Sequence, residues 1–132
     1  MSVRQIIRIL VGAVGVLGML LALRIWMDPA GVAMQLGITG ETGLGRATLR
    51  ADFAGFFGAA GFFAFAAAVR DDRRLVSAPL VMIALALTGR VITAILDGLA
   101  PEQIQPMLIE AVLLVLLAAG RRMLGAGLPR PL

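Results

Sequence analysis

Four long apolar runs constrain this chain more than any other feature. They cover approximately residues 6–27, 48–69, 75–97 and 102–122. Each run has the roughly 20 residues that a helix needs to cross a bilayer. The alternation of apolar and polar residues that a membrane barrel requires is absent. Hydrophobic residues make up 60% of the chain, more than a soluble globule of this size can bury. The sequence therefore predicts an all-α integral membrane four-helix bundle, formed by residues 1–132 as a single domain.

The first run could be a signal peptide, but its flanks favour a retained span. Arg4 and Arg8 precede it, as they would in either case. Arg24 follows the apolar stretch at the place where a small-residue cleavage site would lie. Trp26 then stands where aromatic residues often mark the membrane interface.

The segment between the first two runs predicts a short helix at the membrane surface. Asp28 is a good N-cap and Pro29 suits the first helical position. Gly37 can end the helix. The glycines that follow indicate a loop: Gly40, Gly43 and Gly45.

Two helix faces made of small residues predict close packing between helices. One lies in the first run, at Gly12, Gly15 and Gly18, and the other in the second run, at Ala54, Gly58 and Gly61. Small residues allow helix backbones to approach closely in lipid. The phenylalanines of the second run are expected to pack against neighbours and lipid. We expect this second helix to be the most enclosed of the four.

The distribution of arginine predicts the orientation. One side of the bundle carries Arg4, Arg8, Arg70, Arg73, Arg74, Arg121, Arg122 and Arg130. Only Arg24 and Arg46 lie near the opposite surface, and residues 97–106 contain no basic residue. Because the basic side faces the cytoplasm, we expect both termini inside a bacterial cytoplasmic (inner) membrane.

Four charged residues fall within the outer half of the predicted spans and form the candidate site. They are Arg50, Asp52, Arg90 and Glu110. The secondary candidates near them are Arg24, Asp28, Thr93 and Asp97. A charge in hydrocarbon costs at least about 2.5–3.5 kcal/mol, so these side chains should face inward and pair. We expect Arg90 to pair with Glu110, Asp52 with Arg50 or Arg90, and Arg24 with Asp28.

Two interpretations of this cluster stay open. The charges could be buried ion pairs that fix the register of the helices. They could instead line a polar pocket, open to the outside, for a polar or anionic ligand or for protons. A pocket predicts at least one arginine without a carboxylate partner.

Absent residue types exclude several classes of function. The chain has no cysteine, histidine, tyrosine or lysine. Thiol redox chemistry and the usual zinc and haem sites therefore lack their ligands, and we expect no cofactor and no metal. The arginines punctuate apolar runs instead of forming a basic patch, so we expect no nucleic-acid partner. Only carboxylate acid–base catalysis would remain, and no paired-carboxylate motif indicates an enzyme.

Two functions remain from different classes. One is binding or transport of a small polar or anionic molecule, or of a lipid, through the charged cluster. The other is a non-catalytic accessory subunit, or a homo-oligomer, that docks other membrane helices along a glycine face. If the seam at Gly12, Gly15 and Gly18 packs inside the bundle, the docking hypothesis loses its main support.

Short motifs along residues 4 to 120 also carry a resemblance. In chain order they are Asp28-Pro29, Leu36-Gly37, Leu49-Arg50-Ala51-Asp52-Phe53-Ala54-Gly55, Gly89-Arg90, Asp97-Gly98 and Glu110. They resemble a bacterial family of small four-span proteins of unknown function that is distantly similar to the DoxX-like membrane proteins. That family often has Glu where this chain has Asp52. The resemblance implies a four-helix membrane bundle and no particular reaction.

Overall fold

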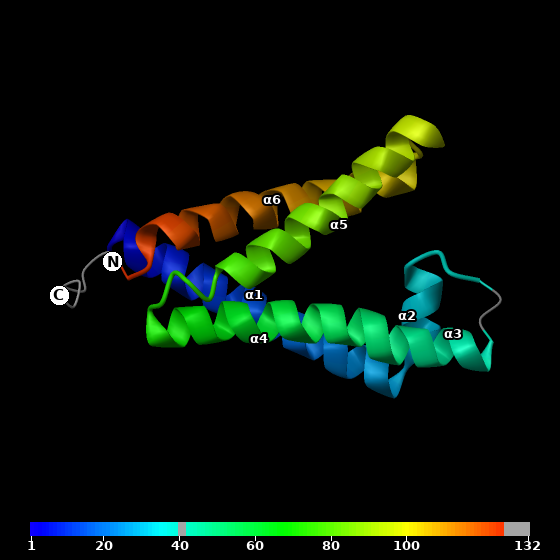
Figure 1. Cartoon of the computed structure of the whole chain (residues 1–132), viewed down its shortest axis with the longest axis horizontal. Helices are drawn as coiled ribbons and strands as arrows, with labels where there is room; N and C mark the ends of the chain where they lie inside the picture. Colours follow the sequence, from blue (N-terminus) through cyan, green and yellow to red (C-terminus); the bar gives the residue numbers. More distant parts are fainter. Residues whose placement is uncertain (40–41, 126–132) are drawn as a thin grey trace.

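The computed structural model describes residues 1–39 and 42–125, which contain helices and connecting turns and no strand (Figure 1). Gly40 of the predicted loop lies outside the described residues. So does Arg130, with the rest of the chain after Gly125. The all-α prediction is confirmed for the part of the chain that is described.

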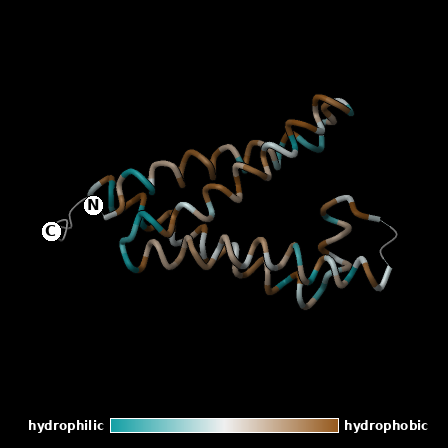
Figure 2. The backbone as a smooth tube through the Cα atoms, in the orientation of Figure 1, coloured by the Kyte–Doolittle hydropathy of each residue, from teal (hydrophilic) through white to brown (hydrophobic). Residues whose placement is uncertain are grey.

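Four helical segments are long and apolar enough to cross a membrane. They are α1 (Val3–Met27), the continuous segment Gly43–Arg70, α5 (Ser77–Leu96) and α6 (Pro101–Met123). Apolar residues predominate along all of them (Figure 2). Burial within the chain reaches 33% in the segment Gly43–Arg70 and at most 17% in the others. The second span is thus the most enclosed, as predicted, and most of the remaining apolar surface is left for lipid.

The second span is a stack of three helical pieces. It consists of α3 (Gly43–Thr48), the π-helical turn η1 (Leu49–Phe53) and α4 (Ala54–Arg70). The predicted loop was therefore wrong at Gly43 and Gly45, since helix begins at Gly43. The Thr42 hydroxyl accepts a hydrogen bond from the Gly45 N–H at 3.2 Å, and this cap helps to offset the poor helix propensity of glycine.

A short helix, α2 (Pro29–Gln35), connects α1 to this stack. The Asp28 carboxylate accepts a hydrogen bond from the Gly31 N–H at 3.0 Å, and Pro29 occupies the first turn. Gly37 has φ +72°, which lets the chain leave the helix in a left-handed turn. All three predicted helix signals, at Asp28, Pro29 and Gly37, are confirmed. The helix buries Pro29, Val32 and Ala33 beside α1 and η1.

Helices α1 and α4 form the tightest pair in the molecule, and glycines make this possible. A Cβ atom on Gly61 would lie 2.6 Å from the Met19 nitrogen and 2.7 Å from the Gly15 oxygen. A Cβ on Gly18 would lie 3.0 Å from the Phe57 oxygen, and one on Gly12 would lie 3.2 Å from the Ala68 Cβ. The predicted glycine seam of the first span is therefore used inside the bundle, against α4.

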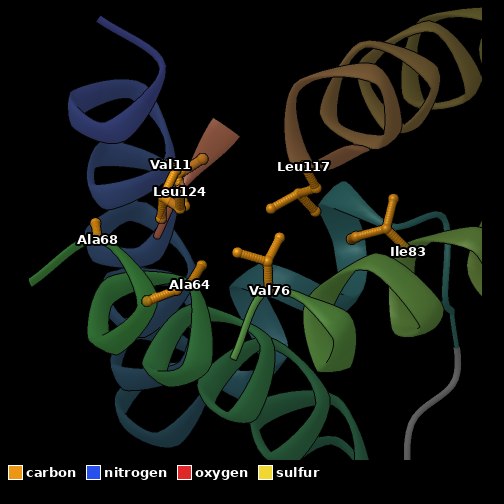
Figure 3. Close-up of a cluster of buried hydrophobic side chains, with 8 residues drawn as sticks. Val11, Ala64, Ala68, Val76, Ile83, Leu117 and Leu124 are labelled. Carbon is orange, nitrogen blue, oxygen red and sulfur yellow. The ribbon is translucent and has the colours of Figure 1, made fainter. Parts of the chain in front are cut away.

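The second pair, α5 and α6, meets the first pair at only one end. Figure 1 shows the two pairs converging beside the N-terminus and diverging toward the other end. The converging end, called the closed end below, holds a core to which α1, α4, α5 and α6 all contribute (Figure 3). Its residues are Val11, Ala64, Ala67, Ala68, Val76, Ile83, Leu117 and Leu124.

Polar contacts reinforce the closed end. Arg4 forms an ion pair with Asp71, whose carboxylate also accepts a hydrogen bond from the Gly125 N–H at 3.2 Å. Arg121 donates a hydrogen bond to the Ser77 hydroxyl. These contacts join the first residues of the chain, the turn after α4, the start of α5 and the end of α6. The closed end is thus stabilised both by its apolar core and by these polar contacts.

The other end, called the open end, has a core that belongs to only one pair. Its buried residues come from α1, α2 and the helical stack: Ala22, Ile25, Val32, Ala33, Leu49 and Ala54. Among the described residues, neither α5 nor α6 contributes to this cluster. The two helix pairs therefore separate toward the open end and leave a space between them.

Candidate functional site

The space between the two helix pairs is a cleft with a volume of about 580 Å³. We call it the inter-pair cleft. Its lining is Leu21, Leu36, Asp52, Phe53, Phe56, Phe57, Ile83, Ala86, Arg90, Pro106, Ile109, Glu110 and Leu113. A further hollow of about 280 Å³ shares Leu21, Phe57, Ile83, Ile109 and Leu113 with it, and only apolar residues and glycine line that hollow. The cleft is thus an apolar slot with three charged side chains in its wall.

Arg90 and Glu110 form the ion pair that the sequence predicts. Arg90 lies on α5 and Glu110 on α6, and the Arg90 Nε donates to Glu110 Oε1 at 2.8 Å. The Glu110 side chain is 13% exposed and that of Arg90 37%. The contact holds α5 and α6 in register. It also places a charged pair at the edge of an apolar cavity.

The ion pair leaves acceptor atoms without donors. Glu110 Oε2 and Gln103 Oε1 are both buried and accept no hydrogen bond within the described residues. Both residues line a separate space of about 240 Å³, together with Ala86, Arg90 and Thr93. We call this space the smaller hollow. A buried acceptor without a donor costs about 1–3 kcal/mol. A polar guest that supplies donors or positive charge would recover that free energy.

Asp52 lies in the cleft wall on the other helix pair. It follows Arg50 by two residues in η1 and is exposed. The expected ion pair of Asp52 with Arg50 or Arg90 was wrong. Within residues 1–39 and 42–125, its carboxylate has no ion pair and no hydrogen bond. Arg90 is instead paired with Glu110, and Arg50 donates to the Trp26 carbonyl oxygen.

Arg50 belongs to η1 and lies outside the cleft lining, where it contacts the C-terminal end of α1. Its Nε donates to the Trp26 carbonyl oxygen at 3.1 Å, and the Trp26 ring nitrogen donates to the Arg50 carbonyl oxygen at 3.0 Å. Carbonyl groups at the end of a helix lack intrahelical donors and carry partial negative charge. Of the two arginines in the predicted cluster, Arg50 is the one without a carboxylate partner among the described residues, and it stabilises a helix end instead of lining the cleft.

None of the four secondary candidates lines the inter-pair cleft itself. Asp28 caps α2 by accepting a hydrogen bond from the Gly31 N–H, and it forms no ion pair with Arg24 among the described residues, so that expected pair was wrong. The Thr93 hydroxyl lines the smaller hollow and donates to the Gly89 carbonyl at 3.1 Å. Asp97 is exposed at the end of α5 and does not line the cleft.

Sequence reasoning missed the phenylalanines as part of the site. Phe53, Phe56 and Phe57 line the cleft. The rings of Phe56 and Phe57 meet edge to face, with centroids 5.3 Å apart. Their spacing of one, four and five residues after Asp52 was the available signal, since such positions cluster on one side of a helix. Without knowledge of the cleft, this spacing could not be distinguished from ordinary packing.

Comparison with known proteins leaves the site to be interpreted from its own chemistry. No protein-family model matches the chain, and no curated protein and no solved structure matches it. The fold and the residues define a multi-pass membrane protein with an apolar cleft and a small number of charged groups at its wall.

Proposed function

We propose that this chain is a multi-pass protein of the bacterial cytoplasmic membrane that binds an amphiphilic small molecule in the inter-pair cleft. The apolar body of the molecule would lie against the phenylalanines and the aliphatic side chains. Its polar head would lie beside Arg90, Glu110 and Asp52. The observation that carries this proposal is the cleft itself, because ligand sites are typically apolar cavities of about 300–1,000 Å³ with a few polar groups.

The unpaired acceptors favour a binding role over a purely structural one. A structural ion pair is expected to have its lone pairs satisfied by protein groups. Here Glu110 Oε2 and Gln103 Oε1 have no donor among the described residues. Asp52 is also unpaired there. The Arg90–Glu110 contact fixes the wall, and the remaining acceptors provide the chemistry for a guest.

The proposed topology places both termini in the cytoplasm and the open end at the outer face, following the distribution of arginine. Helix α2 would then lie at the outer membrane interface, and the cleft would open to that face. We retain the resemblance to the family distantly similar to DoxX-like proteins as a proposal about ancestry, on the motifs given above.

The accessory-subunit alternative has weaker support. It requires a glycine seam that faces lipid and can dock another helix. A Cβ on Gly12, Gly15 or Gly18 would contact α4, so this seam is already occupied within the chain. The cleft, by contrast, has no occupant within the described part of the chain.

Native mass spectrometry in mild detergent tests the proposal. We expect the wild-type protein to carry a bound small molecule or lipid. Ala86→Phe should lose it. Ala86 lines both the inter-pair cleft and the smaller hollow, and a phenyl group there would fill the space.

The matched control is Ala13→Phe, which adds the same group at an exposed position of α1 outside the cleft lining. This variant should retain the bound molecule. A clean apo mass for the wild type, or equal retention by both phenylalanine variants, would contradict binding in the cleft.

A further inference from the structure

We propose that the head of the bound molecule is a cation, so that the ligand is a lipophilic organic cation such as an ammonium or phosphonium compound. This inference rests on the proposed function, since it assigns the ligand class of the same cleft. It also departs from the sequence-based expectation of a polar or anionic ligand, because Arg50 does not line the cleft.

The charges of the cleft wall favour a positive guest. The lining contains one arginine and two carboxylates, so its formal sum is one negative charge. The single arginine is bound to Glu110 at 2.8 Å. Asp52 therefore supplies the uncompensated charge. Asp52 lies exposed at the wall of the cleft, and a cationic head bound beside it would neutralise its charge.

The aromatic rings of the cleft add to this preference. Phe53, Phe56 and Phe57 follow Asp52 directly along η1 and α4 and share its cleft. The face of an aromatic ring attracts a cation within about 6 Å, by roughly 0.5–2 kcal/mol. A carboxylate beside three aromatic rings binds a soft organic cation through both charge and dispersion. The same wall would repel the electron-rich head of an anion.

The smaller hollow also favours a positive guest. Its unsatisfied atoms, Glu110 Oε2 and Gln103 Oε1, are both acceptors. The Nε of Arg90 donates to the other oxygen of Glu110, Oε1. An anionic head would bring further acceptors against these oxygens, whereas a cation would complement them. The charge, the rings and the orphaned acceptors thus all favour a cation.

A pair of probes that differ in charge and little else tests this inference: tetraphenylphosphonium and tetraphenylborate. Binding of each to the detergent-solubilised protein is measured by equilibrium dialysis, with Ala86→Phe as the background for micelle partitioning. We expect tetraphenylphosphonium to bind at least about tenfold more tightly than tetraphenylborate, in proportion to the charge complementarity of the cleft.

Two carboxamide variants locate the effect. Asp52→Asn should weaken tetraphenylphosphonium binding by about fivefold or more, and it should leave tetraphenylborate unchanged or improved. Asp97→Asn removes an exposed carboxylate outside the cleft lining and should change neither probe by more than about twofold. Both substitutions are at exposed positions, so both proteins should fold.

The outcomes separate this inference from the proposed function. If both probes bind above the Ala86→Phe background with equal affinity, or tetraphenylborate binds more tightly, the cleft is a binding site but the cation assignment is wrong. If neither probe exceeds that background, the proposed function fails as well. Equal effects of Asp52→Asn and Asp97→Asn would attribute the selectivity to general surface potential and would overturn the assignment.

Discussion

At the scale of single residues, two arginines connect the ends of α1 and the second span. Each donates hydrogen bonds to carbonyl groups at the C-terminal end of the other helix. Arg8, in the first turns of α1, donates to the carbonyls of Ala68 and Val69 at the end of α4, at 2.6 and 3.1 Å. Arg50, in the opening turns of the second span, donates to the Trp26 carbonyl at the end of α1. Each helix of this antiparallel pair thus supplies a cation to the C-terminal end of the other, where the helix dipole favours positive charge.

We predict that Arg50→Ala lowers the free energy of unfolding by about 1 kcal/mol, because it removes a charged hydrogen bond to a helix end at an exposed site. The midpoint of unfolding by sodium dodecyl sulfate in mixed micelles, followed by far-UV circular dichroism, measures this loss. Arg24→Ala is the matched control: Arg24 is also exposed near the end of α1, and its side chain has no partner within the described residues. Equal losses in the two variants would show that the contact to Trp26 adds nothing beyond the attraction of a nearby cation to the end of α1.

At the scale of elements, the π-helical turn η1 and the glycine contact position the second span. A π-helical turn inserts a residue into a helix and is frequent at functional sites. Here η1 contains both Arg50 and Asp52, which serve opposite sides of the span: Arg50 binds the end of α1 and Asp52 lines the cleft. Beyond this turn, Gly61 lets α4 contact the backbone of α1 directly. The same span can therefore bind α1 closely and present a wall to the cleft.

We predict that Gly61→Ala destabilises the protein by about 2 kcal/mol, because an added Cβ would overlap the backbone of α1 and force the helices apart. Gly55→Ala in the same helix has open space around its added Cβ. It should be neutral or stabilising by up to about 1 kcal/mol through helix propensity. The same detergent titration compares the two variants. Similar midpoints would mean that the close approach of α1 and α4 does not limit stability.

The helices and the Arg90–Glu110 ion pair could be predicted from the sequence. The cleft and the position of Arg50 could not. Long apolar runs specify spans because lipid leaves few alternatives, and the N-cap at Asp28 is a local signal. Arg90 and Glu110 could be paired because each needs an opposite charge in an apolar setting. The cleft could not be predicted, since it depends on how far the two helix pairs separate. Arg50 was misplaced for a related reason: helix ends compete with carboxylates for guanidinium groups, and the sequence does not say which one is near.

At the scale of the whole molecule, two helix pairs are joined at the closed end and separated at the open end. The core of the closed end draws on all four spans, whereas that of the open end draws on α1, α2 and the helical stack. The proposed function depends on this asymmetry, because the cleft exists only where the pairs separate. It also depends on which side of the membrane the open end faces.

We predict that the open end faces outward. The chain has no native cysteine, so single cysteines can report topology without background. Leu99→Cys, in the exposed turn between α5 and α6, should react with a membrane-impermeant maleimide added to intact cells. Ser2→Cys, at the start of α1, should react only after the membrane is permeabilised. The opposite labelling pattern would reverse the proposed topology.

The one-sided attachment of the helix pairs also gives the molecule mechanical leverage. Helix α5 has 20 residues and is therefore about 30 Å long at 1.5 Å per residue. A rotation of about 10° at its attached end would displace its free end by about 5 Å, from the same rise. The width of the cleft at the open end would therefore respond to small changes in the packing of Val76 and Leu117 at the closed end.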